Sequence, residues 1–338
     1  MPASAGGGGH PVTTSLSSGS GASSEAALSS DALPAGRAPR PPGPRRSATS
    51  GDAAGLGRHR AALFVAPALI LVVAFLVVPA VWTVYLGATD YRLTGLQAAS
   101  PQLVGLDNFR EAIADPDFRN SLWLTMLFVL GSAVIGQTCA GFALAWTMRS
   151  VPKLVRAGIE TLVLLAWILP SSIVAFLWVA YLSGQGGTLN ALLHTPGTEW
   201  LLEHPMGSII VFNTWRGTAF SMLLFSAALG AVPPSQLESA RLAGAGTFAQ
   251  LRDVVLPHIR GHVLTNTLLI SLWTFNDFSP YLLTAGGPNH ESETLPVFIY
   301  NKALYGGQLG YGSAISFIML VINLVIALFY VRLLRERR

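Results

Sequence analysis

The sequence predicts an all-α membrane protein that crosses the bilayer several times. Of its 338 residues, 51% are apolar and only 11% are charged, whereas an average soluble domain has about 25% charged residues. The mean hydropathy is +0.50 over the whole chain. Such a value requires several segments that water would not solvate, and a single buried core would not need them. Composition therefore excludes an ordinary water-soluble globular protein.

Six long apolar stretches are the candidate transmembrane helices. Each is long enough, at about 1.5 Å per residue, to cross about 30 Å of hydrocarbon. A buried helix of a soluble enzyme usually has a polar stripe, but the first stretch is apolar all round, which disfavours that alternative. Only Arg216 in the fourth stretch and Asp277 in the fifth are charged. The predicted spans are 62–86, 121–148, 161–183, 208–230, 263–284 and 313–331.

The charges of the connecting segments predict the orientation. Segments 1–60, 149–160, 231–262 and 332–338 together hold 16 basic and 7 acidic residues. The other three loops, which are 87–120, 184–207 and 285–312, hold 4 basic and 9 acidic residues. Loops rich in Lys and Arg stay cytoplasmic, so both termini are expected inside. The excess of basic residues is confined to the loops on one side of the membrane. We therefore expect the chain to contact membrane lipid and expect no nucleic-acid partner.

Residues 1–60 are predicted to be a disordered cytoplasmic tail. They contain 11 Gly, 11 Ser, 11 Ala and 7 Pro, with almost no bulky apolar side chain to bury. The tail ends in Arg58 and Arg60, directly before the first apolar stretch, which favours an uncleaved cytoplasmic flank over a signal peptide. The predicted domains are this tail and a transmembrane domain over 61–338.

The cytoplasmic connection between spans four and five, 231–262, is predicted to start with a short helix. Pro233 and Pro234 end the fourth span. Ser235 and Glu238 then have the spacing of a capping box, in which each side chain bonds a free backbone N–H of the other. The helix is expected to run to about Ala243 and to end at Gly244.

A second short helix is predicted in the same connection. Thr247 and Gln250 repeat the capping spacing, and the helix is expected over 248–256, where Pro257 ends it. Most connections are only about 4 to 6 residues long, so two capped helices indicate a docking element. An amphipathic hairpin lying on the lipid surface is the alternative.

The residues of this loop resemble a known family. Residues 238–246 read Glu-Ser-Ala-Arg-Leu-Ala-Gly-Ala-Gly, similar to the EAA loop of ATP-binding-cassette (ABC) importer permeases, where Glu-Ala-Ala, Gly and Leu-Pro recur at this spacing. The sequence departs from the pattern at Ser239, where Ala is usual, and at Ala243, where sugar permeases often have Asp. By this resemblance, the residues that couple the chain to an ATPase are Glu238, Ser239, Ala240, Arg241, Gly244, Leu256 and Pro257.

The resemblance extends over nearly all of 61–338, and further motifs point to one group of ABC importer permeases. Residues 103–109, Leu-Val-Gly-Leu-Asp-Asn-Phe, resemble a motif of carbohydrate-uptake permeases of the maltose and glycerol-3-phosphate type, as do 187–190 and 275–288. This implies a binding-protein-dependent inner-membrane component of a bacterium, with the type I ABC importer permease fold and six helices. Its implied partners are a second permease subunit, two ATPase subunits and an extracytoplasmic sugar-binding protein.

This chain is not expected to bind ATP or to be an enzyme. A phosphate-binding loop ends in Gly-Lys-Ser/Thr, but the two lysines, Lys153 and Lys302, follow Pro and Asn. ATP and Mg²⁺ are therefore expected on the partner ATPase, with no cofactor on this chain. His258 and His262 lie four residues apart without a third ligand, so no metal site is expected. The sequence shows no recognisable Ser-His-Asp arrangement and no pair of catalytic carboxylates.

Three alternatives remain beside a sugar permease. An ABC permease for a non-sugar solute would share the loop. An ion-gradient-driven secondary transporter should show internal repeats with interrupted helices at matching places. An integral-membrane transferase would need catalytic polar residues gathered at one face.

Two charged residues and several amide and aromatic residues on spans four and five are candidates for the substrate path. A charge at a helix centre costs about 2.5–3.5 kcal/mol on insertion scales. Arg216 and Asp277 both lie roughly 12 to 14 Å below the outer end at helical rise, which suggests an interhelical ion pair. Alternatively, Arg216 snorkels outward and Asp277 borders solvent at a bend near Pro280. Sugars need aromatic faces and hydrogen-bonding groups, supplied here by Asn213, Trp215, Asn266, Trp273 and Asn276, although Trp and Asn also occur at membrane interfaces and between packed helices.

Overall fold

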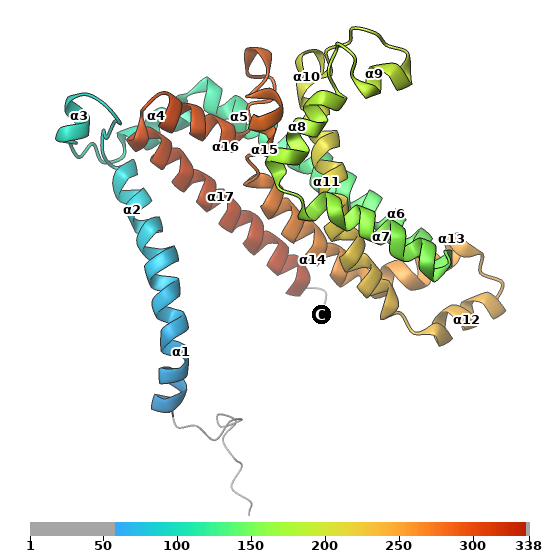
Figure 1. Cartoon of the computed structure of the whole chain (residues 1–338). Coiled ribbons are helices and arrows are strands. Elements are labelled where there is room, and N and C mark those ends of the chain that lie inside the picture. Colours follow the sequence, from blue (N-terminus) through green and yellow to red (C-terminus); the bar gives the residue numbers. More distant parts are fainter. Residues whose placement is uncertain (1–57, 336–338) are drawn as a thin grey trace, which may run out of the picture. The chain divides into compact units, whose positions relative to one another are not determined.

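The computed structural model describes residues 58–335. The predicted tail lies outside these residues, except that 58–60 already form the first turn of a helix. No strand occurs in 58–335, so the all-α prediction is confirmed (Figure 1). The helices are α1 Arg58–Val72, α2 Val78–Gly87, α3 Leu96–Ala99, α4 Asp107–Ala114, α5 Pro116–Phe128, α6 Thr138–Thr147, α7 Lys153–Ile168, α8 Ser171–Tyr181, α9 Thr188–Leu193, α10 Trp200–Glu203, α11 Pro205–Gly230, α12 Pro234–Leu242, α13 Thr247–Gln250, α14 Leu256–Phe275, α15 Ser279–Thr284, α16 Leu295–Tyr300 and α17 Leu309–Arg335.

Short π-helical and 3-10 segments adjoin several of these α-helices. Three of the π segments connect neighbouring α-helices into longer continuous ones. The π segments are η1 Val73–Val77, η2 Val129–Gln137, η4 Leu251–Val255 and η6 Asn301–Tyr305, and the 3-10 segments are η3 Met148–Ser150 and η5 Pro288–His290.

Three continuous helices are long and apolar enough to cross a membrane. They are Ala62–Gly87, Pro116–Ser150 and Leu309–Arg335, and they coincide with the first, second and sixth predicted spans. Two bent helix pairs, α7 with α8 and α11 with α12, raise the number to five if each pair is one span. Six spans are therefore not confirmed within the described part of the chain.

The third predicted span, 161–183, is not one helix. The chain bends by 104° between α7 and α8. Pro170 lacks an N–H and its ring restricts the preceding residue, and Leu169 adopts extended angles of φ −60° and ψ 141°. The α7 helix also begins at Lys153, inside the segment predicted as a cytoplasmic loop.

The fifth predicted span, 263–284, is also interrupted. The α14 helix ends at Phe275, and the short α15 begins only at Ser279, with Pro280 in its first turn. Because Pro280 cannot donate a backbone hydrogen bond to the preceding turn, the segment 276–278 leaves the helix. This break places polar residues at the level of an internal cavity described below.

The first short helix of the connection after span four is confirmed, but its start differs from the prediction. Pro233 is the residue before α12 and no side chain caps the helix, so the Ser235 and Glu238 capping box is wrong. A proline with φ already set for the helix starts α12 earlier instead. At the other end Gly244 has φ +83°, and its N–H donates to the carbonyl of Arg241 while Ala245 N–H donates to Ala240, both at 2.9 Å. This is the glycine-terminated helix end that was predicted.

The second short helix is not separate. From Thr247 the chain is helical through α13 and η4 into α14, so the prediction that Pro257 ends a helix is wrong. In the π turn Leu256 N–H donates to Leu251, five residues back. Such a turn changes the spacing of the carbonyls just where Pro257 would otherwise break the regular pattern. Gly246, rather than Thr247, precedes the helix.

Glycines let α6 and α11 approach closely. A Cβ built on Gly141 would lie 2.9 Å from the backbone nitrogen of Met222 and would also collide with the side chain of Ser221. Small residues at such positions are the usual means by which membrane helices pack. The contact fixes α11, which carries much of the cavity, against α6.

Replacing Gly141 with alanine is expected to destabilise the folded chain by about 1–3 kcal/mol, because α6 and α11 must move apart. Gly158→Ala on α7 is the matched control, since its added Cβ meets nothing within 4 Å and alanine favours helices. Thermal unfolding in detergent measures both. Equal melting temperatures for the two variants would refute the tight-packing account.

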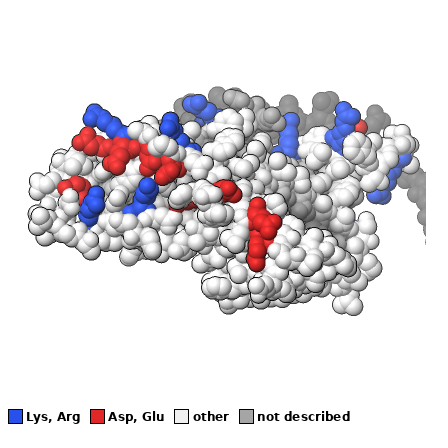
Figure 2. Space-filling view, turned by 90° about the horizontal axis from the view of Figure 1, so that it is seen from above, with Lys and Arg blue, Asp and Glu red and all other residues white. Residues whose placement is uncertain are grey.

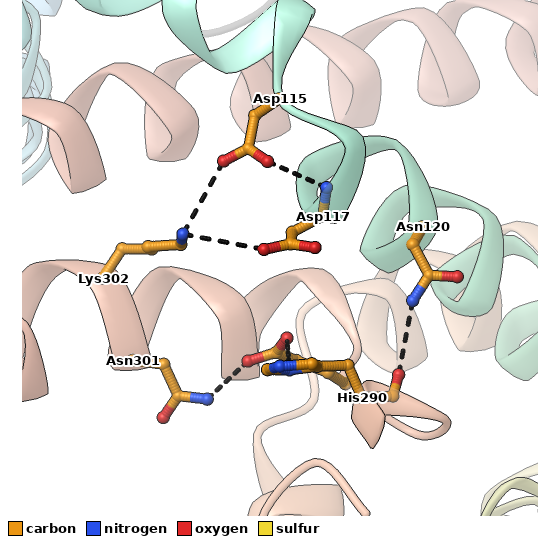
Figure 3. A network of polar contacts seen from close by, with 7 residues as sticks. Asp115, Asp117, Asn120, His290, Asn301 and Lys302 are labelled. Atoms are coloured by element: carbon orange, nitrogen blue, oxygen red, sulfur yellow. Dashed lines mark hydrogen bonds and ion pairs between the residues drawn. The ribbon is translucent and has the colours of Figure 1, made fainter. Parts of the chain in front are cut away.

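A polar network ties the outer ends of three helical segments together (Figure 3). Asp115 accepts from the backbone N–H of Asp117 at 2.8 Å and from the Tyr311 hydroxyl at 2.8 Å. Lys302 lies 3.7 Å from Asp115 and 3.9 Å from Asp117. Burial opposes ionisation of Asp115, but the hydrogen bonds from Tyr311 and the backbone, with the charge of Lys302, lower its pKa.

The Asp115 contacts are expected to make stability depend on pH. Because the folded state lowers the pKa of this carboxyl, the contribution is present at neutral pH and is lost as pH falls below about 4. Asp115→Asn should therefore melt below the wild type at pH 7, and the gap should narrow by pH 3. Asp107→Asn, whose carboxylate is exposed and pairs with the equally exposed Arg110, is the control and should show no gap. A gap for Asp115→Asn that is constant with pH would contradict the assignment.

Charged side chains on the upper face are unevenly distributed (Figure 2). Acidic side chains gather at the end of this face where α3, α4 and α5 lie, with basic ones among them, and much of the remaining visible surface is uncharged. This face carries the loops that were predicted to lie outside the cytoplasm.

Candidate functional site

A cavity of about 420 Å³ lies among the helices at the level of the breaks after α7 and α14. Its lining comes from η2, α7, α8, α11, α14 and the segment 276–278, so parts of the chain that are far apart in the sequence meet there. The lining residues are Gln137, Trp167, Ser171, Asn213, Arg216, Gly217, Phe220, Ile270, Trp273, Thr274, Asn276 and Asp277.

Three aromatic rings form an apolar wall of the cavity. The ring centroids of Trp167 and Trp273 are 5.9 Å apart, and Phe220 lies 5.9 Å from Trp167 and 5.1 Å from Trp273. The Trp273 side chain is 56% exposed, so the cluster leaves part of a flat ring free. Such a ring can stack on the CH-rich face of a ligand.

Several polar lining residues of the cavity are held by hydrogen bonds. The side-chain amide of Asn213 donates to Ser132 at 2.8 Å and to Thr274 at 3.2 Å, and its backbone carbonyl accepts from the Gln137 side chain at 3.1 Å. These bonds join η2, α11 and α14. A Cβ on Gly217 would run into the Gln137 side chain, so glycine at this position makes room for the amide.

The two charged residues of the cavity are connected through a third side chain. Arg216 donates to the Ser279 hydroxyl at 3.4 Å, and that hydroxyl donates to Asp277 at 2.7 Å. No ion pair joins Arg216 and Asp277 within the described residues, so the hypothesis of a direct pair is wrong. The reason is local: Asp277 also accepts from the backbone N–H of Ser279, the first residue of α15, at 3.0 Å.

Five of the seven residues predicted from the sequence for a substrate path line this cavity: Asn213, Arg216, Trp273, Asn276 and Asp277. Trp215 does not. Its ring packs 5.7 Å from that of Trp178 in a separate apolar groove. Asn266 is completely buried and does not line the cavity.

Seven lining residues escaped the sequence analysis: Gln137, Trp167, Ser171, Gly217, Phe220, Ile270 and Thr274. Only Gln137 left a usable trace, as an amide within a long apolar stretch. The others come from helices whose meeting in space depends on tertiary packing.

The predicted coupling loop presents apolar side chains on both sides of its glycine joint. Leu242 is 91% and Phe248 74% exposed, which is unusual for large apolar residues at a protein surface. Arg241 donates to Gln250 at 3.4 Å and so links α12 to α13. Ser239, Ala240 and Pro257 border one open pocket between α12 and the start of α14.

The other predicted coupling residues lie close by. Glu238 and Arg241 line a second pocket, of about 450 Å³, with Arg149 and Arg156. Leu256 is partly exposed at the first residue of α14. All seven residues therefore lie on α12, at its end or at the start of α14.

Comparison with known proteins identifies the family. Residues 137–338 match the family model described as binding-protein-dependent transport system inner membrane component. A probable ABC transporter permease of Pyrococcus horikoshii is 30% identical over 280 residues, which are 79% of this chain and 93% of that protein. The sulfoquinovosyl glycerol permease SmoG and the sn-glycerol-3-phosphate permease UgpA, both of Agrobacterium fabrum, are 27% and 28% identical and cover 83% and 81% of this chain and 92% and 94% of theirs.

The fold agrees with that family. A chain of a bacterial alginate ABC transporter, solved in complex with an alginate pentasaccharide-bound periplasmic protein, superposes with a TM-score of 0.67 at 21% identity and covers 79% of this chain and 91% of its own. The family model alone matches more than half of the sequence. The chain therefore belongs to the binding-protein-dependent transport system inner membrane components and is a multi-pass permease with the ABC importer fold.

Proposed function

We propose that this permease carries a sugar or oligosaccharide through the cavity and that a separate ATPase drives it through the loop 235–257. The observation that carries the proposal is the composition of the cavity, which combines an exposed aromatic face with amide, guanidinium and carboxylate groups. Sugars combine CH-rich faces with many hydroxyls. The names of SmoG, UgpA and the alginate transporter point to related solutes, which supports this class of substrate.

The coupling loop supports the second half of the proposal. A short helix that ends in a glycine turn and exposes Leu242 and Phe248 offers an apolar contact to another polypeptide. A rigid-body movement of α12 would reach α11 through the short turn 231–233 and α14 through the continuous helix from Thr247. Nucleotide-driven closure of an ATPase could thereby move the two helices that hold most of the cavity.

The proposed assembly contains a second permease subunit, two ATPase subunits that bind ATP and Mg²⁺, and an extracytoplasmic sugar-binding protein. The alginate transporter's complex with a periplasmic protein supports a partner of the last kind. Neither ATP nor a metal ion is assigned to this chain.

The test is uptake by the complete complex in vesicles, with sugars chosen by thermal-shift screening of its binding protein. We expect uptake to require ATP, and Trp273→Ala to lower it about tenfold by removing the stacking face. Trp215→Ala is the matched control, since this tryptophan lies outside the cavity. Uptake without the ATPase on an ion gradient would favour a secondary transporter, and uptake of amino acids alone would refute the sugar assignment.

A further inference from the structure

A second pocket, of about 470 Å³, lies between the first turns of α14 and the last turns of α17. The two helices contact each other (Figure 1), and both of these ends lie on the side predicted to be cytoplasmic. Four of the lining side chains are basic: His258, Arg260, His262 and Arg335. No acidic residue of the described part of the chain lines the pocket. Its charge therefore favours an anionic ligand.

The basic side chains are placed by the helical repeat. His258 and His262 are four residues apart on α14, so they lie one above the other on one face. Arg335 is the last residue of α17 and follows the lining residue Val331 by four positions, which again is one face. A Cβ added to the lining residue Gly261 would meet nothing within 4 Å, so this part of the wall is open enough for a ligand to approach.

An exposed apolar stripe continues from the pocket along α17. Leu324, Leu328 and Val331 are 57%, 54% and 42% exposed. They are spaced by four and three residues, and Arg335 follows four residues later, so all four share one face of the helix. Leu269 on α14, one turn beyond the pocket, is also exposed. The groove is therefore basic at its cytoplasmic end and apolar along the part that lies deeper in the bilayer.

This combination fits a phospholipid better than a soluble anion. Phosphate oxygens accept hydrogen bonds from guanidinium groups and from imidazole N–H groups. A free anion would use only the basic end of the groove, whereas a lipid also covers the apolar stripe with an acyl chain. Basic pockets between membrane helices on the cytoplasmic side are typical sites for anionic headgroups.

We propose that this groove holds an anionic phospholipid of the cytoplasmic leaflet, with its phosphate between Arg335 and the two histidines and an acyl chain along the apolar stripe of α17. The bound headgroup would join the start of α14 to the end of α17. Since α14 continues from the proposed coupling loop, the lipid would brace the helix through which that loop acts. The site takes no part in binding the transported solute, so the proposal does not depend on the sugar assignment.

The first test measures lipid retention by the complete complex. The complex is reconstituted with equal amounts of phosphatidylglycerol and phosphatidylcholine and extracted in mild detergent, and retained lipids are counted by native mass spectrometry. We expect the wild type to retain phosphatidylglycerol and Arg335→Gln to retain about fivefold less, the effect of one basic side chain at an anionic surface. Arg332→Gln is the matched control, because this exposed arginine of α17 does not line the pocket. Equal retention by the two variants, or no phosphatidylglycerol on the wild type, would overturn the proposal.

The second test locates the lipid in the wild-type complex and separates it from a free anion. A phosphatidylglycerol with a photoreactive acyl chain should label the peptide of α17 that contains Leu324, Leu328 and Val331. Inorganic phosphate should not prevent this labelling, because it cannot occupy the apolar stripe. Labelling that phosphate abolishes would mean that the pocket takes a free anion. Label found only on the second permease subunit would mean that protein covers the groove. Either result would contradict a lipid site here.

Discussion

Replacing Gly244 with valine is expected to abolish ATP-driven uptake while the chain still inserts and the ATPase still turns over. Gly244 has φ +83°, a conformation in which a β-branched residue is a genuine outlier and costs about 1–3 kcal/mol. The variant can relieve the strain by giving up the bonds from Gly244 and Ala245 that end α12. The loop would then no longer hold Leu242 and Phe248 in one arrangement, and the contact that transmits movement would be lost.

A second glycine in the same loop provides the control. Gly246 has φ −66° and ψ 171°, which any residue adopts, and an added Cβ would meet nothing within 4 Å. Gly246→Ala should therefore transport normally. The decisive measurement is the ratio of solute moved to ATP hydrolysed in reconstituted vesicles. A ratio equal to that of the wild type in Gly244→Val would remove the reason for giving this loop a coupling role.

The prediction that succeeded at Gly244 and those that failed at prolines show what a sequence can determine. Only glycine adopts φ +83° without strain, so one residue type was enough to place the end of α12. Proline is less decisive. Pro67 lies inside α1 and Pro257 inside the continuous helix from Thr247, whereas Pro170 accompanies a 104° bend. In a membrane bundle, neighbouring helices and local π turns can satisfy the groups that a proline frees, so the outcome depends on tertiary packing.

The lining of the cavity was also only partly predictable from the sequence. Charge and polarity within apolar stretches singled out Arg216, Asp277 and Asn213, which line the cavity, because such residues are costly in lipid unless they face the interior. Trp215 was predicted with them but points elsewhere, since adjacent residues on a helix are turned by about 100°. The sequence did not show which face of α11 met η2 and α14. Trp167 and Phe220 were missed for that reason, as apolar residues are expected on every face of a membrane helix.

Arg216 and Asp277 are expected to be energetically coupled although they do not touch. A double-mutant cycle with Arg216→Met and Asp277→Asn should give a coupling energy of about 0.5–3 kcal/mol in stability, within the range seen for residues of one hydrogen-bond network. Each single variant leaves a charged partner in a partly buried site, which is strongly destabilising when it is unpaired, so uptake should also fall in both.

Within the described part of the chain, the Ser279 hydroxyl links the two charges, since it accepts from Arg216 and donates to Asp277. Repeating the cycle in a Ser279→Ala background should therefore reduce the coupling towards the weaker, purely electrostatic remainder. The contact of Asp277 with the start of α15 should survive there, because the backbone N–H of Ser279 still donates to the carboxylate. Unchanged coupling in that background would mean that the charges meet directly in the membrane, and zero coupling in the parent chain would mean that the serine does not connect them.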